Sequence, residues 1–258
     1  MLSYQHGYHA GNMADVHKHA LLAWMLSYLM RKDKPLSYLE THAGRALYDL
    51  KDEAALKTGE AARGIAIAED WFDADHPYRT VLNRTRADAG PQAYPGSPLI
   101  AAQLLRDCDQ IDVAELHPGE MDYLRDALIR YPAGCHQLDG WQMAMSRCPP
   151  DPRRGMLLVD PSFEVKADYG TIPDFFAKIH RKWPVGILAL WYPILVDDRH
   201  LPMTRALQKA IPDATLHEVH FPPAREGHGM VGSGMFVVNA PYGFDNQAAF
   251  LTRKFKEL

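Results

Sequence analysis

The chain has 258 residues, 47% of them hydrophobic and 23% charged, with a formal net charge of −4. This length and composition fit one large α/β domain, or one domain with an insertion, and no apolar stretch approaches the ~20 residues of a membrane helix. The negative charge does not favour a nucleic-acid-binding protein, although local basic clusters can suffice for one.

The cysteines and the first residues indicate the compartment. Cys108, Cys135 and Cys148 are odd in number and form no Cys-x-x-Cys pair, which argues against a disulfide framework or a structural zinc site. The start of the chain has neither the basic region nor the apolar run of a signal peptide. We therefore expect a cytoplasmic protein without a membrane association.

The first part of the sequence predicts a helix and a strand, followed by a stretch of different composition. Apolar residues recur at helical spacing over 15–30, and a short strand is expected over 36–41. The following stretch is charged, rich in Ala and without a convincing strand. We interpret residues 48–93 as a small helical insertion subdomain, and residues 1–47 and 94–258 as the main domain.

An alternation of strands and helices resumes after Tyr94. Ser97 is predicted to cap a helix over 99–106, with Pro98 at its first position. Further helices are expected over 119–130, 169–182 and 200–210. Strands are expected over 110–116, 136–138, 156–159, 186–191, 216–221 and 234–239. This rhythm predicts an α/β fold with a doubly wound parallel sheet, whose last two strands form an antiparallel pair.

Several predicted strands end in residues that suit a cofactor. In open α/β sheets, ligands bind at the carboxyl ends of the strands. Gly44 would allow a close backbone turn, Glu115 would accept from a ribose diol, and Asp139 would accept from an adenine amine. Acids after strands are also common as helix caps or turn residues, so this alternative stays open.

The most informative strand end is the one after Met156–Val159. The proline at 161 stops the hydrogen-bonding ladder and leaves Asp160 at the edge of the sheet, with Phe163 close behind. The carboxylate of Asp160, the rigid carbonyl of Pro161 and the ring of Phe163 together suit a planar substrate that carries an NH2 group. An ordinary turn with a capping Asp is the alternative.

The segment before the first helix is rich in His and aromatic residues. His and Asp at these spacings could bind a metal, but His17 and His19 cannot share a helix face, so we expect no metal. Aromatic and basic side chains such as Tyr4 and His6 also suit stacking on bases and contact with phosphate.

Common nucleotide-binding and hydrolase motifs are missing from the sequence. The first strand is not followed by G-x-G-x-x-G, which weakens a dinucleotide dehydrogenase hypothesis. Neither G-x-x-x-x-G-K-[ST], G-x-S-x-G nor H-E-x-x-H occurs. The simplest P-loop enzymes, hydrolases and zinc proteases are therefore excluded.

Eight segments spread over nearly the whole chain carry a further signal. They are Met1–Asn12, Asp15–His19, Tyr38–Gly44, Tyr94–Ile100, Glu115–Pro118, Asp139–Gly140, Leu190–Pro193 and Gly229–Met235. Together they resemble the bacterial RlmJ family of large-subunit ribosomal RNA adenine N6-methyltransferases, earlier labelled as proteins for the use of external DNA. The first and third segments are the most specific.

The resemblance implies a Rossmann-like class I methyltransferase sheet with a helical insertion after the first strand. It implies S-adenosylmethionine as the cofactor, 23S ribosomal RNA as the substrate and a monomeric enzyme. The implied cofactor-binding residues are Lys18, His42, Ser97, Glu115, Asp139, Gly140 and Asp160. The implied catalytic residues are Asp160, Pro161 and Phe163, and the implied substrate-binding residues are Tyr4, His6 and Phe163.

The sequence departs from the family pattern at three positions. Ser162 replaces the second proline of the usual Asp-Pro-Pro-Tyr form, and Phe163 replaces its tyrosine. Phe keeps a stacking face but loses the hydroxyl, so base positioning should survive. Glu40 is found where Asp is common, which puts the fine geometry of the first turn in doubt.

Two other functions remain open from the sequence. A DNA adenine-N6 methyltransferase would use the same chemistry at the edge of the sheet. A non-enzymatic nucleic-acid-binding protein involved in external DNA use could retain the cofactor fold without its activity.

Overall fold

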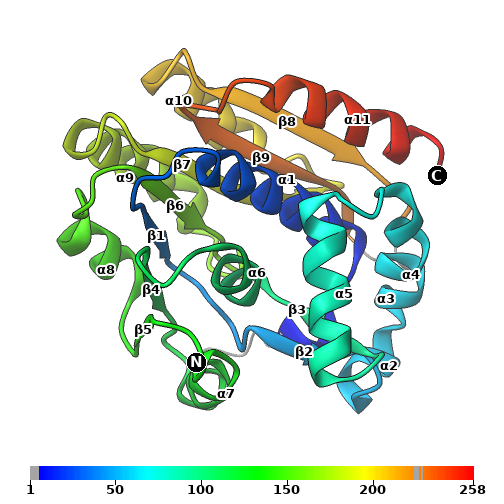
Figure 1. The fold of residues 1–258 in the computed structure, drawn as a ribbon. Coiled ribbons are helices and arrows are strands. Elements are labelled where there is room, and N and C mark those ends of the chain that lie inside the picture. Colours follow the sequence, from blue (N-terminus) through cyan, green and yellow to red (C-terminus); the bar gives the residue numbers. More distant parts are fainter. Residues whose placement is uncertain (1–5, 224–226, 228) are drawn as a thin grey trace.

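A seven-stranded sheet forms the centre of the computed structural model, which describes residues 6–223, 227 and 229–258 (Figure 1). In order across the sheet, the strands are β5 (Ala133–His136), β4 (Gln110–Ala114), β1 (Ser37–Glu40), β6 (Gly155–Val159), β7 (Ile187–Leu195), β9 (Met230–Val238) and β8 (Thr215–His220). The first five strands are parallel, and β9 runs antiparallel to both β7 and β8. The predicted doubly wound sheet and its final antiparallel pair are confirmed.

The chain order reverses between β1 and β6. From β1 the chain moves outward to β4 and β5, and it then returns to the other side of β1 to form β6 and β7. In register, Glu40 at the end of β1 lies between Val113 of β4 and Leu158 of β6. Such a reversal leaves a crevice at the carboxyl ends of the two central strands, which is where ligands bind in open α/β sheets.

Helices cover both faces of the sheet and form two cores. Along each buried strand, successive side chains point to opposite faces. Tyr38 and Leu158 accordingly join one core, and Leu39 and Leu157 the other. The first core includes α1 (Met13–Met30), α6 (Ser97–Leu104), α7 (Pro118–Leu128) and α11 (Phe244–Lys256). The second core includes α8 (Gly140–Arg147), α9 (Asp168–Lys182) and α10 (Leu201–Ala210).

Residues 50–92 run between two short strands that pair with each other. β2 (Leu47–Asp49) and β3 (Ala93–Pro95) are antiparallel, so the predicted insertion begins and ends in strand. Between them lie α2 (Glu53–Thr58), α3 (Glu60–Arg63), α4 (Ile65–Ala68), the 3-10 helix η2 (Glu69–Trp71) and α5 (Pro77–Ala89). These helices form a layer beside α1, and α5 shares its core (Figure 1). The division of the chain into a main domain and a subdomain stays a prediction.

Two sequence-based predictions of local structure are wrong. Gly96, not Ser97, is the residue before α6, because the Ser97 hydroxyl donates to the buried carboxyl group of Glu40 instead of capping the helix. The strand expected over 136–138 lies earlier, at Ala133–His136, since Asp139 already caps α8. Among the described helices, none has the length and apolar character needed to cross a membrane.

Candidate functional site

A cavity of about 350 Å³ opens at the carboxyl edge of the central strands. Eight residues predicted from the sequence line it: His6, Lys18, His42, Ser97, Glu115, Asp160, Pro161 and Phe163. Two others, Asp139 and Gly140, lie at the start of α8 and are not among the lining residues. Tyr4 lies outside the described residues. The structure thus brings most of the predicted residues to one edge, while their roles stay predictions.

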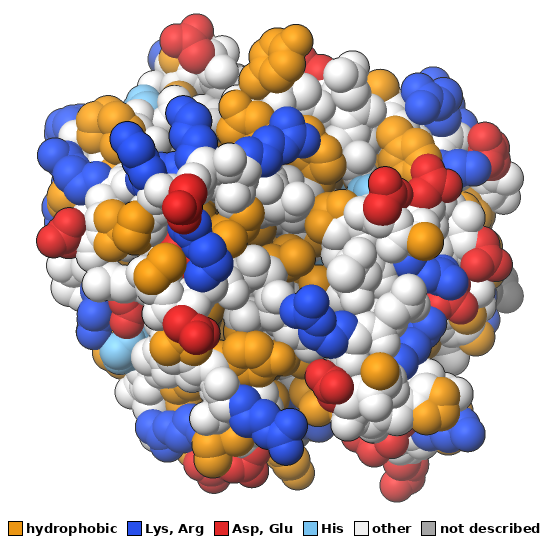
Figure 2. Space-filling model, in the orientation of Figure 1, with side chains coloured by type: hydrophobic (Ala, Val, Ile, Leu, Met, Phe, Trp, Pro, Cys, Tyr) orange, Lys and Arg blue, Asp and Glu red, His pale blue; other side chains and the backbone are white. Residues whose placement is uncertain are grey.

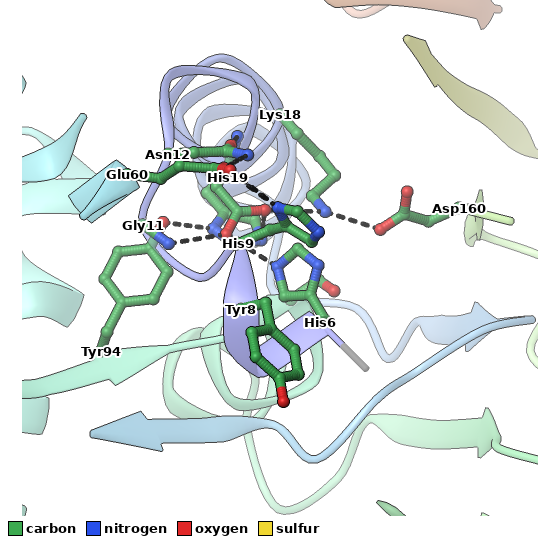
Figure 3. Close-up of polar contacts among 12 residues, drawn as sticks. His6, Tyr8, His9, Gly11, Asn12, Lys18, His19, Glu60, Tyr94 and Asp160 are labelled. Atoms are coloured by element: carbon green, nitrogen blue, oxygen red, sulfur yellow. Dashed lines mark hydrogen bonds and ion pairs between the residues drawn. The ribbon is translucent and has the colours of Figure 1, made fainter. Parts of the chain in front are cut away.

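Two residues that line the cavity form an ion pair: Lys18 of α1 and Asp160, which directly follows β6. Figure 3 shows the side chain of Lys18 reaching from α1 to Asp160, which follows β6. The Lys18 Nζ lies 2.6 Å from Asp160 Oδ2 and 3.1 Å from Asp15 Oδ1. Burial alone would lower the pKa of Lys18, but the two carboxylates raise it above its ordinary value. Lys18 therefore carries a positive charge that is buried between two acids.

Asp15 connects this ion pair to the segment before α1. Its Oδ2 accepts from the backbone N–H of Gly11 at 2.9 Å and lies 2.9 Å from His6 Nε2. Burial alone would raise the pKa of Asp15, but the charges of His6 and Lys18 lower it well below its ordinary value. A carboxylate with several charge-assisted hydrogen bonds is held in one orientation. Asp15 thereby fixes both Lys18 and the turn that leads into α1.

Glu40 is a second buried acid behind the cavity. It has no solvent exposure, and its carboxyl group accepts from Ser97 Oγ at 2.5 Å and from Tyr38 Oη at 2.8 Å. Burial raises the pKa of Glu40 to about 8, although the two hydroxyl groups oppose the shift. Burial thus favours the protonated form of Glu40 over a pH range in which a free glutamate is ionised, and the carboxyl group ties β1 to the start of α6.

Glu115, which follows β4, also lines the cavity and joins two loops there. One carboxylate oxygen accepts from the N–H of Gly44 at 2.8 Å, and the other accepts from the N–H of His117 at 2.7 Å. Gly44 has a φ of +61°, a conformation that favours glycine, and a Cβ there would come within 2.6 Å of the Tyr48 hydroxyl. The half-buried carboxylate keeps further acceptor capacity toward the cavity, because each oxygen has two lone pairs.

His42 lies between the cavity and the start of α8. Its Nδ1 is 2.7 Å from Thr41 Oγ1, and its ring meets Trp141 edge to face at 5.1 Å between centroids. Burial lowers the pKa of His42 to about 4, against the opposing charges of Asp160 and Asp139. The ring is therefore neutral at pH 7, with its orientation fixed by Thr41 and Trp141.

The first residues of α8 pack directly on the backbone that follows β1. Asp139 Oδ1 accepts from the N–H of Gln142 at 2.9 Å and caps the helix. A Cβ on Gly140 would lie 1.8 Å from the carbonyl oxygen of Thr41, so glycine is required by close approach. This contact explains the Asp-Gly pair and sets the distance between α8 and the cavity.

Phe163 belongs to an aromatic cluster in the cavity wall. It is 6% exposed, and its ring centroid lies 4.8 Å from that of Tyr169 and 6.1 Å from that of Trp191. Its φ of +56° is unusual for a bulky residue and marks backbone strain. Pro161 is buried beside it. The loop after β6 is therefore held in a specific, strained shape.

Sequence reasoning assigned no role in the chemistry of the site to two residues that shape it. Asp15 could have been recognised because it precedes Lys18 by three positions and therefore lies on the same face of α1. Trp191 lines the cavity at 5.4 Å from Lys18 Nζ, yet nothing in the order of residues distinguishes it from a core tryptophan.

The segment before α1 is also fastened to the helices that follow β2. Glu60, which is 5% exposed, accepts from Asn12 Nδ2 at 3.0 Å and lies 3.0 Å from His9 Nδ1 (Figure 3). A Cβ on Gly64 would meet the carbonyl oxygen of Gly11 at 2.1 Å. Within the described ranges, no three His, Cys, Asp or Glu side chains are grouped so that they could hold a metal ion.

The chain is similar to known proteins over nearly its whole length. Residues 33–256 match the model of a family described as ribosomal RNA large subunit methyltransferase D, RlmJ. The chain is 38% identical over 254 residues to ribosomal RNA large subunit methyltransferase J of Escherichia coli (strain K12), covering 96% of this chain and 90% of that protein. For the protein of the same name from Haemophilus influenzae, the identity is 35% over 253 residues, with the same coverage. A crystal structure of a protein from Legionella pneumophila has a TM-score of 0.85 and 32% identity, covering 95% of this chain and 92% of that one.

Proposed function

The chain belongs to the RlmJ family of ribosomal RNA large subunit methyltransferases, and we propose that it methylates the N6 amine of an adenine in 23S ribosomal RNA. The observation that carries this proposal is the edge formed by Asp160 and Pro161, which shares one cavity with Glu115. An acceptor pair for an amine and an acceptor for a ribose thus line one cavity.

The residues around the cavity fit S-adenosylmethionine. Glu115 presents a half-buried carboxylate above the glycine turn at Gly44, which suits the ribose hydroxyl groups. Lys18, His42 and Ser97 would hold the methionine end, and the half-buried Asp139 together with Gly140 would hold the adenine end. When bound, the cofactor supplies an electrophilic methyl group.

Asp160 and Pro161 orient the attacking amine. The lone pair of an adenine amine is delocalised into the ring, so the nitrogen is a poor nucleophile. The Asp160 carboxylate and the Pro161 carbonyl can each accept a hydrogen bond from one N–H of the amine, which favours a tetrahedral nitrogen. Lys18 occupies Oδ2 of Asp160 and leaves Oδ1 for the substrate. Asp160 need not be a strong base, because the amine can lose its proton after methyl transfer.

Aromatic side chains complete the base site. Phe163 offers a ring for stacking, which is worth about 1–3 kcal/mol per base. The target adenine leaves its helical stack to enter the cavity. His6, together with Tyr4, would contact the RNA on either side of that base, and the RNA path runs over the N-terminal segment and the helices between β2 and β3.

The surface supports a modest electrostatic contribution to RNA binding. Figure 2 shows Lys and Arg side chains interspersed with Asp and Glu over one face of the molecule. With a net charge of −4, binding should be weaker than for a basic protein and still depend on salt. We propose that the protein acts as a monomer in the cytoplasm, where ribosomes are assembled.

A methyl-transfer assay with three nucleic acids tests the proposal. Labelled S-adenosylmethionine is added with unmodified 23S ribosomal RNA, with its isolated domains or with duplex DNA. We expect label on RNA and none on DNA. Label on DNA alone would show a DNA methyltransferase, and nucleic-acid binding without label would show a non-enzymatic binding protein; either result rejects the proposal.

A further inference from the structure

A chain of buried hydrogen bonds leads from the cavity wall into the core. The indole Nε1–H of Trp191 donates to Ser233 Oγ at 2.9 Å, and Ser233 Oγ lies 2.8 Å from His17 Nδ1. The other ring nitrogen of His17 is 2.9 Å from His217 Nδ1. Ser233 and His17 have no solvent exposure. This series of hydrogen bonds therefore joins α1, β7, β8 and β9 through polar atoms inside a hydrophobic core.

The far end of the chain lies on α11. His217 Nε2 is 2.9 Å from Thr252 Oγ1, whose hydroxyl donates to the carbonyl oxygen of Ala248 at 3.0 Å. This last step stays within the helix, so the chain ends on a backbone acceptor. Every polar side chain along it has a partner on each side.

Because its first donor, the indole N–H, can only donate, all the hydrogen bonds in this series point in one direction. An indole N–H can only donate, so Ser233 Oγ accepts from Trp191 and its own hydrogen is available for His17 Nδ1. His17 then carries its proton on Nε2 and donates to His217. With the protons reversed, the Ser233 hydroxyl would lose this acceptor. The forward direction satisfies all the groups, as buried polar atoms require.

The two histidines are neutral in this arrangement. Burial, with a smaller effect of His217, lowers the pKa of His17 well below its ordinary value. Burial also lowers the pKa of His217. Neutral rings are what a one-directional chain needs, because a charged imidazole would present two donors.

Trp191 lies at the position where the chemistry is proposed to occur. Leu190 of β7 pairs with Val159 of β6, so the next residues, Trp191 and Asp160, are neighbours at the edge of the sheet. The Trp191 ring is 5.4 Å from Lys18 Nζ and meets the Phe163 ring edge to face. It therefore contacts both the ammonium group that holds Asp160 and the ring proposed to stack on the base.

We propose that Trp191 is the second aromatic wall of the adenine site and that Ser233, supported by His17, is the positioning residue that holds its indole ring in place. This inference rests on the proposed function, since it assigns walls to the base site of that reaction. The hydrogen bond fixes the rotation of the indole, so that its face meets Lys18 and its plane lies at 65° to that of the Phe163 ring. Without it, the ring can turn and admit the base in unproductive orientations.

The direct test compares Ser233→Ala with Thr252→Val, a matched control at the far end of the chain. Both variants remove one hydroxyl from the same network, but only the first touches Trp191. We expect Ser233→Ala to lower kcat/KM for RNA about tenfold while the Kd for S-adenosylmethionine stays within twofold. Thr252→Val should keep kcat/KM within twofold, and Ser233→Thr, which retains the hydroxyl, should restore most of the lost activity.

A second readout does not depend on activity. The indole N–H signal of Trp191, identified in a ¹H–¹⁵N spectrum by its loss in Trp191→Phe, should exchange slowly with solvent in the wild type. In Ser233→Ala it should exchange at least tenfold faster, and in Thr252→Val it should be unchanged. Unchanged exchange in Ser233→Ala, or equal kinetic losses in both variants, would overturn the positioning role. If wild-type protein transfers no methyl group, the proposed function fails, while the exchange measurement still decides whether Ser233 holds Trp191.

Discussion

The charged side chains at this site are held in place by ion pairs with one another. The Lys18 ammonium group is balanced by Asp160 on one side and Asp15 on the other. A buried cation with two carboxylate partners is far less costly than an unpaired one. The arrangement keeps Asp160 oriented with one oxygen available, and it keeps a compensating partner for Lys18 if Asp160 is removed.

Glu40 gives a prediction for the dependence of stability on pH. Its pKa is raised from 4.5 to about 8 by burial, so the folded protein retains a proton that the unfolded chain releases. The stabilisation is present in full below pH 4.5 and is lost as the pH rises through 8. Relative to wild type, Glu40→Gln should gain free energy of unfolding between pH 5 and 8, by ~1 kcal/mol per pH unit.

Urea denaturation of both proteins at several pH values measures this difference. The comparison cancels the contributions of other titrating groups, such as His42. A difference that stays constant from pH 5 to 8 would contradict a protonated Glu40.

Sequence reasoning identified residues of the site more readily than the side chains to which they are hydrogen-bonded. The acids at 115 and 160 were identified because each follows a predicted strand, which is a local signal. The partners of Ser97 and Trp191 could not be found in this way. Glu40 lies 57 positions from Ser97, and Ser233 lies 42 positions from Trp191, so only the fold brings each pair together.

At the scale of elements, close backbone approach sets the position of α8. The helix starts where Gly140 packs on the carbonyl of Thr41, directly behind His42. Sequence reasoning missed both α8 and α11. Helix α8 spans only eight residues, too short for a clear period. Helix α11 has a regular apolar stripe at Phe244, Ala248, Leu251 and Phe255, which could have been recognised.

Adding one methyl group at the start of α8 tests this packing. Gly140→Ala should lower the free energy of unfolding by about 1–3 kcal/mol, because its Cβ cannot fit against Thr41. It should also weaken binding of S-adenosylmethionine, since α8 must move away from His42. Gly170→Ala in α9 is the control, because a Cβ there has no neighbour within 4 Å. Chemical denaturation and calorimetric titration give the two quantities; equal stability of the two variants would refute the close contact.

At the scale of the whole molecule, the site is a junction of distant segments. Residues of the segment before α1 line the cavity together with residues that follow β1 and β6, and Glu60 fastens that segment to the helices between β2 and β3. The parallel, doubly wound sheet was predictable because strands and helices alternate along the sequence. The packing of α5 on α1 was not, since it brings together two helices that lie more than 40 residues apart in the sequence, and α1 is buried on nearly all sides.

We expect Asp160 to direct methyl transfer to an adenine amine of ribosomal RNA. The most direct measurement digests unmodified 23S ribosomal RNA to nucleosides after reaction with S-adenosylmethionine and identifies the methylated product by mass spectrometry. We expect N6-methyladenosine with wild-type protein. Asp160→Ala should fold, because Asp15 remains as a partner for Lys18, should bind the cofactor at least weakly, and should give no product. A different methylated nucleoside, or near wild-type turnover by Asp160→Ala, would contradict the account.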